Sequence, residues 1–109
     1  MKVELIVVPD CPNEGPASAL LRRAMDEAGL DDVTFDTTVV TTQLQAEARR
    51  FVGSPAFLIN GRDPFAAAGA APAVACRVYR TGQGLSGTPA LADLVTALRA
   101  SRRQSSCDS

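Results

Sequence analysis

An alternation of strand-type and helix-type patterns constrains this chain more than any other feature of its sequence. Residues 1–8 are apolar and rich in β-branched side chains, which is typical of a strand buried on both faces. Residues 12–28 instead place their apolar side chains at helical spacing. Gly29 then suits the left-handed position at the end of a helix. The chain therefore begins with a strand and a helix that can pack against each other.

Three further strand signals follow. Residues 33–40 and 56–59 are predicted as strands from their β-branched and apolar content, and residues 77–80 as a weaker one. Asn60-Gly61 is a strong two-residue hairpin signal, so the strand before it should turn back on itself. The Ala-, Gly- and Pro-rich stretch after the turn has no periodicity and is predicted as a loop.

Two more helices are indicated by their capping residues. Thr42 and Gln45 have capping-box spacing, which predicts a short helix. Thr88-Pro89 predicts the N-cap and first position of a last helix that ends near Ala100. This placement suits proline because the first helical position needs no hydrogen bond from its nitrogen.

The resulting order is β-α-β-α-β-β-α, which predicts an α/β fold with a central mixed sheet and helices on both faces. Its strands should be mostly parallel, with the hairpin adding an antiparallel edge strand. Residues 1–100 form the one expected domain, and residues 101–109 a polar, flexible tail. Ligands of such sheets bind beyond the carboxyl ends of the strands, so the turn at residues 9–14 is an expected position for a functional site.

Composition excludes several classes of function. The 109 residues are 46% hydrophobic and have a formal net charge of −1, so no nucleic-acid or membrane partner is expected. Histidine is absent, which removes imidazole catalysis and imidazole-ligated zinc. With neither a signal-peptide core nor a long apolar span, and only three cysteines, the sequence favours a cytoplasmic protein without a disulfide framework.

Cys11 is the residue with the clearest chemical potential. It follows the first strand directly and precedes the first helix, whose positive end favours a thiolate over a thiol. Asp10 and Glu14 place negative charge nearby and act in the opposite direction. We therefore expect a reactive cysteine here, with a structural cysteine as the alternative.

The segments Cys11-Pro12 and Gly53-Ser54-Pro55, each at its junction with a strand, resemble the thioredoxin-like family. The resemblance implies that Cys11 is a nucleophile and that Pro55 is a cis-proline beside it. The stretches VPDCPNE, GSPAFLINGRDPFA and ACRVYRTGQGLSG are similar to short bacterial thioredoxin-like proteins that are often labelled alkylmercury-lyase-like.

This chain departs from the dithiol pattern because Glu14 occupies the position of the second cysteine. Cys11 cannot then release a mixed disulfide by attack from a neighbouring thiol. We expect a monothiol redox or thiol-transfer protein whose partner is a small thiol or a protein thiol or disulfide. Cys76, far along the chain, is the alternative resolving residue, with packing as its other interpretation. No cofactor is expected.

Two other functions stay open. The first is a thioredoxin-like binding module in which Cys11 is incidental. The second is organomercurial or soft-metal handling by Cys11 and Cys76, with Asp10 or Asp63 as a proton donor. An ordinary closed metal site is not expected from three cysteines without histidine. The arginines of the second half are predicted to form a solvated basic face, with an anion-binding patch as the alternative: Arg62, Arg77 and Arg80.

Overall fold

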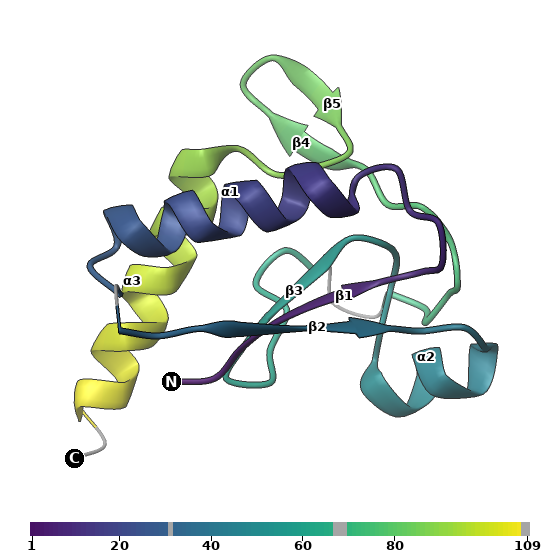
Figure 1. The fold of residues 1–109 in the computed structure, drawn as a ribbon, viewed down its shortest axis with the longest axis horizontal. Coiled ribbons are helices and arrows are strands. Elements are labelled where there is room, and N and C mark those ends of the chain that lie inside the picture. The colour runs from purple at the N-terminus through teal and green to yellow at the C-terminus, as the bar shows by residue number, and fades with distance from the viewer. Residues whose placement is uncertain (31, 67–69, 108–109) are drawn as a thin grey trace.

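The chain folds around a sheet that carries helices on its two faces (Figure 1). The computed structural model describes residues 1–30, 32–66 and 70–107. Its helices are α1 (Glu14–Glu27), α2 (Gln43–Arg49) and α3 (Leu91–Cys107). Its strands are β1 (Val3–Val7), β2 (Phe35–Val39), β3 (Ala56–Ile59), β4 (Tyr79–Thr81) and β5 (Gly84–Ser86).

The central sheet has three strands in the order β2-β1-β3. Strand β1 pairs in parallel with β2 and antiparallel with β3, so the sheet is mixed. The predicted mixed α/β class is confirmed, but the source of the antiparallel strand is different. The sequence pattern assigned it to a strand after Asn60-Gly61, whereas it is β3, the strand before that turn. Strands β4 and β5 form a separate antiparallel hairpin.

All five residues of β1 are buried, as its apolar sequence predicted. Because side chains alternate along a strand, Val3 and Leu5 belong to one core cluster and Ile6 to another. The first cluster contains the apolar faces of α1 and α3. The second contains Ala46 of α2 and Phe51. Helices therefore cover both faces of the sheet, with α1 and α3 on one and α2 on the other (Figure 1).

Glu4 is the one charged residue within β1, and it lies on the face covered by α2. Its side chain is 10% exposed and forms ion pairs with Arg49, the last residue of α2, and with Lys2. A buried carboxylate is costly unless it is paired. This pairing explains how an acidic residue can stand in a buried strand, and it joins α2 to the sheet.

The ends of the helices agree only partly with the capping signals. The predicted capping box at Thr42 and Gln45 is present at the start of α2. Helix α3 begins at Leu91, two residues after Pro89, which is a buried residue ahead of the helix. It continues to Cys107, past the expected end near Ala100.

The turn at Asn60-Gly61 forms with φ values of 54° and 81°, as its sequence predicted. Arg62 bridges back to Ile59, but no strand follows it in the described residues before β4. A loop instead runs back along the other end of β3. There the N–H of Ala73 donates to the carbonyl of Phe51 (3.0 Å). The loop thus returns the chain to the segment that leads into β3.

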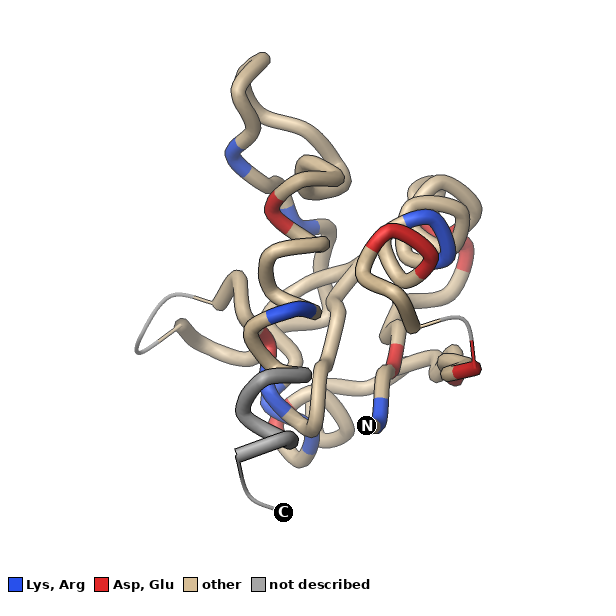
Figure 2. Tube along the Cα trace, turned by 90° about the vertical axis from the view of Figure 1, so that its left-hand side faces the viewer, with Lys and Arg blue, Asp and Glu red and all other residues tan. Residues whose placement is uncertain are grey.

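Charges are spread over the surface rather than gathered on one face. Figure 2 shows acidic and basic positions interspersed along α1 and α3. One exposed pair, Arg23 with Glu27, lies within α1 at a distance of 3.9 Å between nitrogen and oxygen.

In the part of the chain that the structure describes, the helices are too short or too polar to span a membrane.

Candidate functional site

Cys11 lies in the turn that connects β1 to α1, at the sheet end where the sequence placed it. Asp10 has a φ of 57°, so the chain bends sharply directly before the cysteine. The carbonyl of Cys11 accepts a hydrogen bond from the N–H of Glu14 (3.2 Å). The cysteine is 9% exposed and packs within the larger core cluster. It is therefore held by both the turn and the core.

Helix α1 begins later than its periodicity predicted. Asn13 is the N-cap, so Pro12 precedes the helix instead of occupying its first turn. Cys11 consequently stands two positions ahead of the cap. The segment after β5 covers this end of α1, because a Cβ added to Gly87 would collide with the side chain of Asn13.

The hydrogen bond to the sulfur comes from Ser54. Its hydroxyl Oγ lies 3.0 Å from the Cys11 Sγ and donates to it. The same hydroxyl accepts a hydrogen bond from the N–H of Val8 at 3.1 Å. A hydroxyl has a single proton to donate. The Val8 N–H uses an acceptor site of this hydroxyl and leaves its proton free, and that proton is donated to the sulfur.

Reasoning from the sequence did not single out Ser54 as a site residue. The signal that could have found it is its place directly before Pro55, at the start of a predicted strand. Ser54 is fully buried. A buried hydroxyl requires a hydrogen-bond partner, so a serine next to an expected site proline is a candidate for contact with the cysteine.

Pro55 is buried beside Ser54, and the peptide bond between them is cis, as the resemblance implied. The carbonyl of Pro55 accepts a hydrogen bond from the hydroxyl of Tyr79, the first residue of β4. Strand β4 is thereby attached to the segment that leads into β3. The structure brings Cys11, Ser54 and Pro55 to one place.

Cys76 is brought to the same region from the loop that follows β3. It forms an isolated parallel bridge with Ser54. Unlike Cys11, it is exposed, and both thiols are free. The predicted site residues Cys11, Pro55 and Cys76 are thus all neighbours of Ser54, by hydrogen bond, by sequence or by backbone pairing. The side chain of Cys107 is outside the described side chains.

A buried ion pair holds the loop that carries Cys76. Arg77 Nη1 lies 2.5 Å from Asp63 Oδ2, and these side chains are 9% and 7% exposed. A second oxygen of Asp63 accepts the N–H of Phe65 at 2.9 Å. Arg77 is therefore not part of the basic face that the sequence suggested. Arg62 and Arg80 are exposed, as that face requires.

Tyr79 stands between this ion pair and Pro55. The guanidinium of Arg77 lies 4.5 Å from the centre of its ring, and Phe57 and Phe65 contact the ring edge to face. Burial raises the pKa of the Tyr79 phenol well above its ordinary value; Arg77 acts in the opposite direction, and Asp63 adds to the rise. The phenol is therefore held as a neutral hydrogen-bond donor to Pro55.

Comparisons with family models, with curated proteins and with solved structures found no match to this chain. Within the described residues, no three His, Cys, Asp or Glu side chains gather as a metal site would require. Asp10 and Glu14, the acidic neighbours of Cys11 in sequence, are exposed to solvent, which screens their charge.

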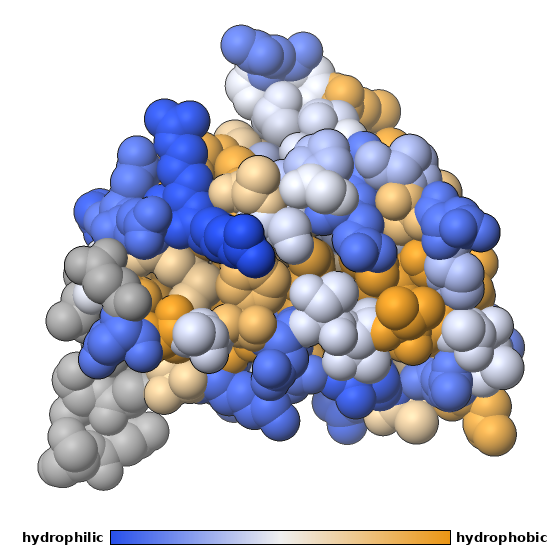
Figure 3. Space-filling model, in the orientation of Figure 1, coloured by the Kyte–Doolittle hydropathy of each residue, from blue (hydrophilic) through white to orange (hydrophobic). Residues whose placement is uncertain are grey.

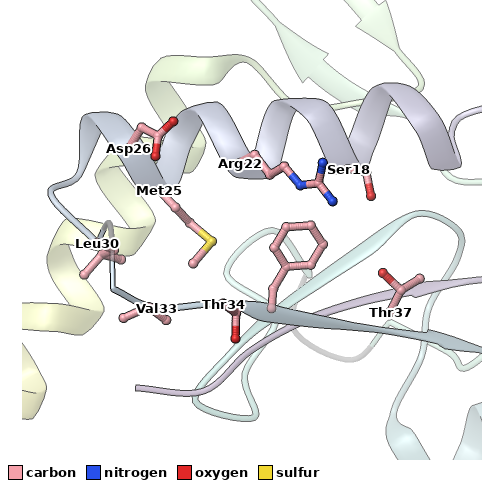
Figure 4. A pocket seen from close by; sticks show the side chains of 9 residues that line it. Ser18, Arg22, Met25, Asp26, Leu30, Val33, Thr34 and Thr37 are labelled. Carbon is pink, nitrogen blue, oxygen red and sulfur yellow. The ribbon is translucent and has the colours of Figure 1, made fainter.

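A hollow of about 460 Å³ lies elsewhere, between α1 and the β2 edge (Figure 4). Arg22 reaches over the ring of Phe35 there, at 5.8 Å from its centre. Figure 3 shows hydrophobic surface in the band between α1 and β2, with hydrophilic side chains along its borders. The residues that line the hollow do not include Cys11, Ser54, Pro55 or Cys76. It is a separate surface feature.

Proposed function

We propose that this protein is a thioredoxin-like thiol protein in which Cys11 is the nucleophile of a redox or thiol-transfer reaction. One observation carries the proposal: the hydroxyl of Ser54 donates a hydrogen bond to the Cys11 sulfur. Hydrogen bonds to charged acceptors are stronger than those to neutral ones. The donor is therefore placed to stabilise the negative charge that the sulfur carries when it attacks or leaves a disulfide.

The arrangement of elements supports the thioredoxin-like part of the proposal. Cys11 follows the central strand β1 and precedes α1, and Pro55 leads directly into the antiparallel strand β3. Strands β1 and β2 are parallel neighbours. The carboxyl end of β1 thus faces the segment before β3, and the cysteine and the proline meet there.

In the proposed reaction, the Cys11 thiolate attacks one sulfur of an external disulfide. A bond forms between Cys11 and that sulfur, and the other thiol leaves as a thiolate that takes a proton from water. The partner is the disulfide of a small thiol or of a protein, and the reverse reaction uses the corresponding thiol. We include a cytoplasmic location in the proposal, since small thiols that can reverse the reaction are abundant in that compartment.

The test uses a variant in which Cys11 is the single thiol, made with Cys76→Ser and Cys107→Ser. Its folded form is incubated with oxidised glutathione, and the products are read by mass spectrometry. We expect a mixed disulfide at Cys11. The same variant with Cys11→Ser is the control for reaction elsewhere. A Cys11 that reacts only after unfolding would contradict the proposal.

A non-catalytic binding module is the second candidate. The observation in its favour is the low exposure of Cys11, which is 9%. Under this alternative, the surface around the turn at Cys11 binds a partner and the sulfur is only packed. An unreactive Cys11 in the folded variant is the result that this alternative predicts.

A further inference from the structure

Ser54 connects Cys11 to a second cysteine through its backbone. Its N–H donates to the carbonyl of Ala75 at 2.8 Å, and its own carbonyl accepts from the N–H of Arg77 at 2.9 Å. These two hydrogen bonds set Cys76 directly opposite Ser54 as its bridge partner. The backbone of Cys76 is therefore one strand spacing, about 4.8 Å, from that of Ser54.

The direction of the side chains follows from this pairing. Residues that stand opposite each other in neighbouring strands project to the same face. The side chain of Ser54 points to Cys11, since its hydroxyl hydrogen-bonds the sulfur. The side chain of Cys76 therefore leaves the backbone on the face where Cys11 lies. Cys76 is exposed and Cys11 is nearly buried, so the second thiol stands on the solvent side of the first.

The position of Cys76 is fixed by the residue after it. Arg77 forms the buried ion pair with Asp63 and stacks on Tyr79. It also approaches Gly53 closely, because a Cβ added to Gly53 would lie 2.8 Å from the Arg77 Cβ and 3.4 Å from its Cα. The loop is thus attached on both sides of Ser54. The backbone of Cys76 is therefore held beside the site, while its side chain is exposed.

We infer that Cys76 is the resolving thiol of Cys11, an inference that rests on the proposed function. After Cys11 has formed a mixed disulfide with a small thiol, the Cys76 thiolate attacks the Cys11 sulfur. A Cys11–Cys76 disulfide forms, and the bond to the small thiol breaks. The small thiol leaves with the electron pair and a proton from water. The protein is thereby oxidised by two electrons, and the external disulfide is reduced to two thiols.

In this assignment, Cys76 takes the role of the second cysteine that the turn at Cys11 lacks. Glu14 stands where a dithiol protein has its second cysteine, four positions into the motif. A thiol tethered by the fold acts at an effective concentration on the order of millimolar. With external thiol at about 0.1 mM, resolution by Cys76 should therefore be about tenfold faster than resolution by solution thiol.

The experiment compares two full-length proteins that both carry Cys107→Ser, one with Cys76 and one with Cys76→Ser. Each is mixed with oxidised glutathione and about 0.1 mM reduced glutathione as the solution thiol, and products are separated by intact mass. With Cys76 present, we expect an intramolecular disulfide, seen as the loss of two hydrogen atoms. With Cys76→Ser, we expect the glutathione mixed disulfide at Cys11 to accumulate and to decay about tenfold more slowly.

A positional control moves the second thiol by one residue. Cys76→Ser combined with Ala75→Cys moves the thiol off the residue that pairs with Ser54, where it should not restore the intramolecular disulfide. Equal accumulation of the mixed disulfide with and without Cys76 would overturn the inference and leave the proposed function standing. Absence of any mixed disulfide at Cys11 in Cys76→Ser would overturn both.

Discussion

Ser54 donates its hydroxyl proton to the sulfur of Cys11, across a separation of 43 positions in the sequence. This contact joins the turn after β1 to the segment before β3. Its geometry also depends on Val8, whose N–H occupies an acceptor position of the same hydroxyl. Ser54 is therefore both a structural link between two strands and the donor that faces the candidate nucleophile.

We expect Ser54→Ala to slow the alkylation of Cys11 at neutral pH. Loss of a hydrogen bond worth about 1 kcal/mol corresponds to a rate about fivefold lower. The measurement is the iodoacetamide rate of folded protein in which Cys11 is the single thiol. Ser18→Ala, at a residue of α1 that lines the separate hollow, is the control and should leave the rate unchanged. An unaltered rate in Ser54→Ala would show that the hydroxyl does not assist the sulfur.

We expect Asp63→Ala to destabilise the fold strongly, because it leaves the buried guanidinium of Arg77 without its partner. Breaking a buried pair in this way costs about 3–5 kcal/mol. Urea denaturation measures the free energy of unfolding. Glu27→Ala breaks the exposed pair with Arg23 and should cost less than about 1 kcal/mol. Similar losses in the two variants would mean that the buried pair does not hold the loop.

Gly53→Ala should also destabilise the protein, for a steric reason. Gly53 has a φ of 144°, and an added Cβ would lie 2.8 Å from the Cβ of Arg77. Such a backbone conformation costs a non-glycine residue about 1–3 kcal/mol. Gly82→Ala is the control, because nothing lies within 4 Å of its Cβ position. Thermal unfolding should show a lower midpoint for the first variant alone.

The raised pKa of Tyr79 predicts that the folded protein loses stability at high pH. Burial raises its pKa in the folded protein above the value of about 10 in an unfolded chain. The contribution of Tyr79 to the free energy of unfolding is therefore complete below about pH 10. It declines as the pH rises from about 10 toward the pKa of the folded protein, because in that range the unfolded chain loses the phenol proton while the folded protein keeps it. Tyr79→Phe should lack this decline and lose about 1 kcal/mol at neutral pH with its bond to Pro55.

The check on Tyr79 is direct because the chain has a single tyrosine. Phenolate absorbance of the wild-type protein should appear together with unfolding, not before it. Phenolate absorbance at about pH 10 in protein that is still folded would contradict the assignment.

The sequence correctly predicted those strands, helix starts and turns that depend mainly on neighbouring residues. The strand at 56–59 and the capping box at Thr42 both appear where the sequence placed them. Asn60-Gly61 forms its turn because both residues tolerate a positive φ. The strand expected after it does not form beyond Arg62, since a turn does not supply the pairing that a strand needs. That pairing is decided elsewhere in the chain.

The candidate site likewise combines residues that the sequence indicated with contacts that only the folded structure shows. Position and residue type were enough to single out Cys11, which follows a recognisable strand, whereas Pro55 was expected from the thioredoxin-like resemblance and Cys76 only as an alternative second thiol. Their common neighbour Ser54 could be identified only in the folded structure. Its hydroxyl and backbone bond residues that are distant in sequence, and no local preference records such contacts. Periodicity and turn chemistry determined the succession of strands and helices; burial and long-range hydrogen bonding decided which of their ends meet.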